Sequence, residues 1–275
     1  MNMPVIKAAA NVLVHCPNMM MDHGTTLTQE KAKNPDSDYM KSIGNFVRSY
    51  EESVSYAPNQ VFIGNMKPSD LSKVSAPWYK NPVEPKTDGK FGQIMTEVDF
   101  YGLMKICDRF ELVELSSDAA PVIKENLQAT EMFSEAQLSL LDKSMPVSEI
   151  QAMVDKHIAL GLYDGDRLLG CVREAHESDP NLSSHVVFEN LVTKASGVLA
   201  MKQLFKKNNI NPADVDYIVE TSEEAVGDMN QRGGGNMAKA CGEAAGCINA
   251  TGIDMRGFCA GPAHGIVNAS ALVQA

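Results

Sequence analysis

Long apolar runs are missing from this sequence of 275 residues. No stretch approaches the roughly 20 apolar residues that a membrane-spanning helix needs, so we expect no membrane insertion. The first residues, Met1 to Lys7, lack the apolar segment and cleavage site of a secretory leader. The sequence therefore predicts a cytoplasmic protein.

Basic residues are in the minority: 24 Lys and Arg stand against 35 Asp and Glu, which gives a formal net charge of −11. Because nucleic acids and anionic membranes attract positive charge, this balance argues against both as partners. It does not exclude a protein partner. The hydrophobic share of 44% is ordinary for a globular protein, and the length suffices for one or two domains.

Metal and nucleotide motifs are also lacking. The six cysteines do not follow zinc-site spacing, which needs two close pairs, and in a reducing compartment they are expected to be free thiols. The glycines at 233–235 are not followed by Gly-Lys-Ser/Thr and do not follow a predicted strand. Neither a phosphate loop nor a dinucleotide motif is therefore present, and we expect no metal and no cofactor.

The first two thirds of the sequence mix weak strand signals with helical periodicity. Residues 5–15 predict a buried strand or a pair of short strands. Residues 68–92, which are rich in Pro and hold the only tryptophan, predict an ordered loop or a surface arm. His157 is expected in the core or at an interface. The other predicted elements are a strand at 60–65, helices at 38–50, 99–110, 148–160 (ended by Gly161) and 166–176, and a capping box formed by Ser134 and Gln137.

From residue 186 onward, helices and strands alternate. The predicted elements are a helix at 191–207, a strand at 215–220, a small-residue helix at 237–245 ended by Gly246, a strand within 248–255 and a last helix after Cys259. Short links between such elements are typical of an α/β protein with parallel strands.

Cys259, where the last strand meets the last helix, is the candidate catalytic residue. The first N–H groups of a helix carry partial positive charge, which favours the thiolate, the nucleophilic form of cysteine. Gly257 and Gly261 leave room for a substrate carbonyl, Pro262 suits the first helical turn, and the Cys259 N–H is expected to bind an oxyanion. The alternative is a buried structural cysteine.

The pattern Gly257-x-Cys259-x-Gly261 also fits the nucleophile elbow of α/β-hydrolases. That fold places its acid and its histidine after the nucleophile, and His264 is the only histidine that follows here. Five positions along a helix turn a side chain by about 140°, so His264 is not expected to face the same way as Cys259. The hydrolase interpretation is therefore weak.

Residues 191–275 resemble the amino-terminal half of the thiolase superfamily, most closely β-ketoacyl-acyl-carrier-protein synthase III. The resemblance rests on Asn-Pro-Ala-Asp-Val-Asp-Tyr-Ile-Val at 211–219, the small-residue helix and Cys-Ala-Gly at 259–261. It implies half of an αβαβα fold, with a first strand in residues 1–18, a large, mostly helical insertion at 19–185 and a half-core at 186–275. It also implies that Cys259 is acylated, on a buried helix.

Segments inside and beyond the expected insertion make the resemblance more specific. Tyr56 to Asn65 and Glu224 to Lys239 are similar to segments of the beta subunits of component C in glycine/sarcosine/betaine reductase complexes, and essentially the whole chain resembles their amino-terminal half. That family implies an oxidoreductase complex of anaerobic amino-acid fermentation with acyltransferase chemistry. Its component C receives a carboxymethyl selenoether from component A, a selenoprotein, and releases acetyl phosphate through an acetyl thioester. The implied partners are the component C alpha subunit, components A and B, phosphate and the acetyl group.

The sequence departs from the thiolase pattern in one respect, and two alternative functions stay open. Thiolase-fold enzymes need polar residues from a second half, which is expected to begin where this sequence stops, at Ala275. We therefore expect a chain that is truncated or completed by another chain, poorly active alone, with a large exposed apolar edge. The alternatives are a non-catalytic structural subunit, with the thiol chemistry on the alpha subunit, and a β-ketoacyl synthase III-like acyltransferase acting on coenzyme A or acyl carrier protein.

Overall fold

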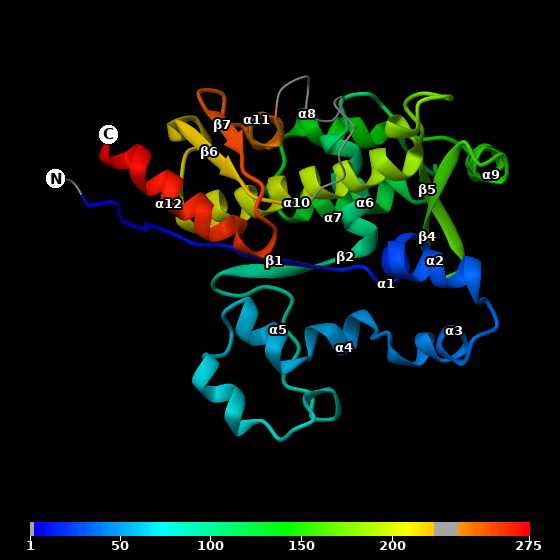
Figure 1. Ribbon diagram of the computed structural model, residues 1–275, viewed down its shortest axis with the longest axis horizontal. Helices are drawn as coiled ribbons and strands as arrows, with labels where there is room; N and C mark the ends of the chain where they lie inside the picture. The colour runs from blue at the N-terminus through cyan, green and yellow to red at the C-terminus, as the bar shows by residue number, and fades with distance from the viewer. Residues whose placement is uncertain (1–2, 223–235) are drawn as a thin grey trace.

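A computed structural model describes residues 3–222 and 236–275 of the chain (Figure 1). The protein is a mixed α/β structure, as expected, and its described strands form three small sheets, β1–β2, β3–β5–β4 and β6–β7. The long helix α10 (Ser184–Asn208) runs through the middle of the molecule and contacts β1, β4, β5, α6 and α11. Among the described residues, no helix has the length and apolar character that crossing a membrane requires. The thiolase-like arrangement and the division at residues 18 and 185 stay predictions.

The first sheet joins two strands that are far apart in sequence. β1 (Asn11–His15) and β2 (Gly92–Thr96) run parallel. The strand predicted at 5–15 is therefore correct only over its last part. Val5 and Ile6 are 73% and 85% exposed, because this part of the chain runs along the surface without a strand partner among the described residues.

Short helices fill the region between these strands. They are α1 (Pro17–His23), α2 (Thr25–Lys33), α3 (Asp38–Ser42), α4 (Tyr50–Val54) and α5 (Ala57–Phe62), with 3₁₀ turns at Ile43–Phe46, Pro68–Lys73 and Trp78–Lys80. The helix expected at 38–50 is interrupted after Phe46, and the strand expected at 60–65 is wrong. Pro58, which suits a first helical turn, begins a helix there instead. The Pro-rich loop has no α-helix or strand up to β2, as predicted.

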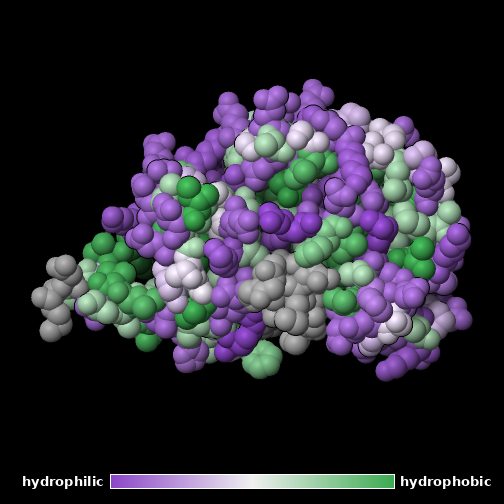
Figure 2. Space-filling model, turned by 90° about the horizontal axis from the view of Figure 1, so that it is seen from above, coloured by the Kyte–Doolittle hydropathy of each residue, from purple (hydrophilic) through white to green (hydrophobic). Residues whose placement is uncertain are grey.

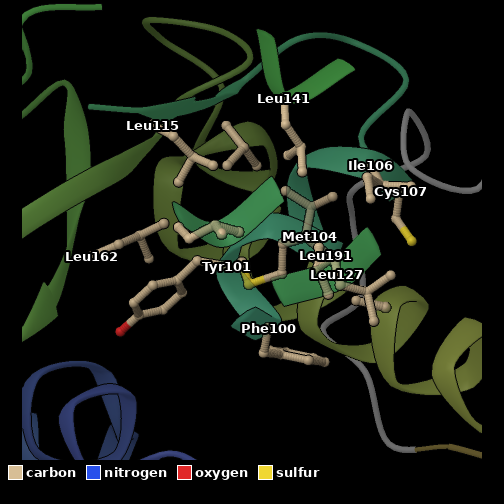
Figure 3. Close-up of a cluster of buried hydrophobic side chains, with 14 of the residues drawn as sticks. Phe100, Tyr101, Met104, Ile106, Cys107, Leu115, Leu127, Leu141, Leu162 and Leu191 are labelled. Carbon is tan, nitrogen blue, oxygen red and sulfur yellow. The ribbon is translucent and has the colours of Figure 1, made fainter. Parts of the chain in front are cut away.

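The largest apolar cluster lies around α6 (Glu97–Cys107), the helix predicted at 99–110 (Figure 3). Figure 3 shows Phe100, Tyr101 and Met104 of α6 among leucines from β3, β4, α7 and α10. The elements around it are β3 (Val113–Leu115), α7 (Ala120–Ala129), α8 (Glu135–Leu138), a 3₁₀ turn at Ser139–Asp142, α9 (Val147–Asp155), β4 (Ala159–Asp164) and β5 (Arg167–Arg173). The capping box of Ser134 and Gln137 is confirmed at the start of α8.

One helix prediction in this region is correct only in its first part, and a second is wrong. The helix expected at 148–160 ends at Asp155, and Gly161 lies inside β4 and caps no helix. His157 is exposed, with a left-handed φ of 58°, so it is not a core residue. The helix expected at 166–176 is strand β5, which pairs antiparallel with β4 across a tight turn at Gly165. Asp-Gly is a strong hairpin signal, and it outweighs the helical periodicity.

The last third follows the predicted order. After a 3₁₀ turn at Pro180–Leu182 and α10 come a 3₁₀ turn at Pro212–Asp214, β6 (Tyr217–Glu220), α11 (Met237–Ala245), β7 (Thr251–Asp254), a 3₁₀ turn at Phe258–Ala260 and α12 (Gly261–Gln274). β6 and β7 pair in parallel, as expected. Gly246 ends α11 in the left-handed region at a φ of 100°, which glycine adopts without a steric penalty. The glycines at 233–235 lie outside the described residues.

Candidate active site

Cys259 lies on the short turn between β7 and α12, where the sequence places it. The turn is held by the Ala260 N–H, which donates to Gly257 O at 3.0 Å. Phe258, directly before the cysteine, has a left-handed φ of 48°, which costs a non-glycine residue about 1–3 kcal/mol. Backbone strain of this kind clusters at functional sites, and no sequence signal marked Phe258.

The Cys259 N–H is a backbone donor without an acceptor among the described residues, whereas the Gly261 N–H donates to Phe258 O. Pro262 stands in the first turn of α12, as predicted. A Cβ on Gly257 would lie 3.3 Å from Gly261 N, so a side chain there would crowd the helix start. The close approach of the chain to itself thus requires a small residue at 257.

Hydrogen bonds and an ion pair connect the ends of β6 and β7, which precede the site, with each other and with α11. The Asp254 carboxylate accepts hydrogen bonds from Met237 N (2.7 Å) and Ala238 N (2.8 Å), and Arg256 forms an ion pair with Glu220 at 2.8 Å. These contacts fix the end of β7 against the start of α11 and the end of β6. Sequence reasoning missed all three polar residues, although an acid at the end of each parallel strand was a signal for such a role.

The site lacks a general base among the described residues. No hydrogen bond joins Cys259 Sγ to another described side chain, and His264 packs beside Gly257, with its Cδ2 3.3 Å from the Cβ position of that glycine. His15 and His23 bind backbone carbonyls elsewhere, at 2.9 and 2.7 Å. The described residues also contain no group of three or more His, Cys, Asp or Glu that could hold a metal ion.

The six cysteines, which all lie in the described part, differ sharply in exposure. Cys259 is exposed, so the alternative of a buried structural cysteine is wrong. Burial raises the pKa of Cys107 and of Cys171 to about 12, and it also raises the pKa of Cys16 and of Cys241. Burial disfavours a thiolate, because the charged form loses its solvation. Cys259 is therefore the thiol that a reagent or substrate reaches most easily.

The helix that carries the site is not buried, contrary to the expectation from the resemblance. α12 packs on β6 through Gly265, whose Cβ position is 2.9 Å from the Thr221 side chain. No described residue buries its opposite side, where Ile266, Val267 and Val273 are 60%, 69% and 63% exposed. The expected exposed apolar edge is thus present along α12, and Figure 2 shows apolar side chains gathered near the two chain ends.

Fold and site together describe a mixed α/β chain with a single exposed thiol between a parallel strand and a helix. The chain is 48% identical, over 277 aligned positions, to the glycine/sarcosine/betaine reductase complex component C subunit beta of Peptoclostridium acidaminophilum. The alignment covers all of this chain and 54% of the relative, so the chain spans about half the length of that protein. No family model matches the chain, and no solved structure matches it.

Proposed function

We propose that this chain is the thiol-bearing part of a component C beta-type subunit, and that Cys259 carries an acetyl group as a thioester. A phosphate oxygen then attacks the thioester carbonyl, the new C–O bond forms, the C–S bond breaks, and acetyl phosphate leaves the Cys259 thiolate behind. The observation that carries this proposal is the exposure of Cys259 alone among the six cysteines, at the start of a helix. The similarity to a reductase component supports it.

The local geometry supports each part of this transfer. The Cys259 N–H, which has no described acceptor, can donate to the oxyanion that forms when the thioester carbonyl is attacked. The N-terminal end of α12 favours negative charge on the thiolate and on the incoming phosphate. The strained backbone at Phe258 fixes the nucleophile on an open surface, where a large partner carrying the two-carbon unit can reach it.

The missing acid–base group has to come from outside the described residues. The open side of α12 is where we expect another segment or subunit to pack, since an exposed apolar patch marks an interface. A groove of about 450 Å³ between β6 and α12, lined by Tyr217, Gly265 and Leu272, lies on this side. The partners in the proposal are the component C alpha subunit and components A and B.

The test is mass spectrometry of the intact protein and its peptides after incubation with acetyl phosphate, alone and with the alpha subunit. The reverse of the proposed transfer acetylates Cys259, and Cys259→Ala abolishes the adduct. Cys16→Ala is the matched control, because Cys16 also stands between a strand and a helix that begins with proline, but it is half-buried. The Cys16 variant should be acetylated like the wild type.

A structural role is the second candidate, because the described residues hold no base beside Cys259. In that case the Cys259→Ala complex turns over at the wild-type rate, and acetyl phosphate modifies the alpha subunit instead. A synthase III-like acyltransferase would instead need coenzyme A or acyl carrier protein for any transfer. Assays of the assembled complex with and without these carriers separate the three functions.

A further inference from the structure

A groove lies between the end of the 3₁₀ turn at Ile43–Phe46, helix α4 and the Pro-rich loop that holds Trp78. It measures about 740 Å³. None of its lining residues belongs to β7, α12 or the turn between them. Figure 1 shows α4 and α5 on the opposite side of β1 and β2 from that turn. The proposed acetyl transfer therefore does not use this groove.

The walls of the groove are mainly aromatic. Phe46, Tyr56, Trp78 and Tyr79 line it. Phe46 and Tyr79 are 78% and 61% exposed, while Tyr56 and Trp78 are half-buried. Exposed apolar side chains that gather in one place mark an interaction site, and aromatic residues are enriched where proteins bind one another. The groove therefore has the composition of a docking surface for a protein segment.

Polar groups on these rings indicate which backbone conformation fits the groove. Elsewhere, the hydroxyls of Tyr50 and Tyr101 each donate to a backbone carbonyl at 2.8 Å. The hydroxyls of Tyr56 and Tyr79 and the indole N–H of Trp78 form no hydrogen bond within the described part of the chain. A polyproline II helix has no internal hydrogen bonds, so its carbonyls can accept from such donors. In an α-helix those carbonyls are already bonded, so the groove favours a proline-rich segment.

Charged groups in the groove indicate which residue accompanies the prolines. Glu51 and Glu52 line the groove and are exposed, and neither has an ion-pair partner in the described part of the chain. The guanidinium of Arg48, a basic lining residue, stacks on the Tyr56 ring at 4.3 Å. A basic side chain of a partner would gain charge-assisted hydrogen bonds with the two carboxylates, whereas an acidic one would be repelled.

We propose that this groove docks a proline-rich segment of a partner protein that carries an arginine or a lysine next to its prolines. The prolines pack against the rings of Phe46, Trp78 and Tyr79. The hydroxyls of Tyr56 and Tyr79 donate to carbonyls of the segment, and its basic side chain binds Glu51. Because a polyproline II segment is already extended before it binds, docking costs little conformational entropy.

A fluorescence titration of the full chain tests the proposal, because Trp78 is the only tryptophan and lines the groove. The probe is a synthetic peptide of six prolines followed by two arginines, with both ends blocked. One control peptide has glutamates in place of the arginines, and the other has glycines in place of the prolines. We expect the probe to change the Trp78 emission in a saturable way.

Both control peptides should bind at least about tenfold more weakly than the probe. The first loses the charge complementarity with the groove, and the second is a flexible chain that has to be ordered on binding. Equal binding of either control and the probe would overturn the proposal. The same holds if the probe causes no saturable change at millimolar concentration.

Tyr79→Ala removes an exposed ring and should weaken binding of the probe at least about fivefold. Tyr39→Ala is the matched control, because Tyr39 is 51% exposed on α3 and does not line the groove. Phe46→Ser is measured in parallel in case Tyr79→Ala does not fold. Wild-type affinity in either folded groove variant refutes the aromatic contact.

Two further measurements separate the charge contact and the other occupant of the groove. Glu51→Gln should reduce the preference for the arginine peptide over the glutamate peptide by about threefold, and an unchanged preference contradicts the role of this carboxylate. A second copy of this chain is the other occupant. If dilution of the chain alone changes the Trp78 emission and Tyr79→Ala removes that change, the groove is a contact between copies and the proposal is wrong.

Discussion

Selective alkylation of Cys259 in the native protein is the sharpest consequence of the cysteine environments. Burial raises the pKa of Cys107 and Cys171 to about 12. At pH 8 the thiolate fraction of each residue is therefore only about 10⁻⁴. A free thiol with the reference pKa of about 8.5 is about one quarter ionised at that pH. The reactive form is thus about 2,000-fold scarcer in these two buried residues than in a reference thiol, before access to the reagent is counted.

The assay is a time course with iodoacetamide at pH 8, followed by denaturation, a second isotopic label and peptide mass spectrometry. We expect Cys259 to take the first label, and Cys107 and Cys171 the second, because both are buried. Denaturation in urea before the first label is the control, and there all six cysteines should react at similar rates. Native labelling of Cys107 or Cys171 within tenfold of the Cys259 rate would refute the reasoning.

Three further predictions concern stability. Asp254→Ala removes the carboxylate that caps α11 and should lower the free energy of unfolding by about 1–2 kcal/mol in urea titrations; a change below about 0.5 kcal/mol would contradict this. Burial lowers the pKa of His23, so the folded state binds its proton less readily than the unfolded state. Stability should therefore fall as pH drops below about 6.5, and His23→Gln should flatten the thermal-melting profile between about pH 5 and 7; an equally steep profile in the variant would count against it. Gly102→Ala places a Cβ 2.2 Å from the Ile123 side chain and should cost about 1–3 kcal/mol, whereas Gly44→Ala, with nothing within 4 Å, should cost less; equal unfolding midpoints for the two would show that the α6–α7 contact relaxes freely.

Local signals predicted two helix ends of this protein correctly and one, the C-cap expected at Gly161, incorrectly. The capping box at Ser134 and the C-cap at Gly246 depend on residues a few positions apart, and both are confirmed. Predictions failed where the structure depends on distant partners. Residues 167–173 are a largely apolar run that fits a buried strand or a helix. The Asp-Gly turn at 164–165 and pairing with the distant strand β3 both favour the strand.

The candidate site was predictable in its position but not in its surroundings. The sequence places Cys259 between a strand and a helix, because Gly257 and Pro262 mark the turn and the helix start. Its exposure depends on what covers α12, and no local pattern encodes that.

The parallel pairing of β1 with β2 has a consequence for biosynthesis. The two strands lie about 80 positions apart, so β1 has no partner until the ribosome has made and released the whole of β2. At about 5–20 residues per second, that delay is about 4–16 seconds. During this interval β1 is an unpaired strand edge on a nascent chain, which makes this early stage the one at which a holding chaperone would benefit the protein most.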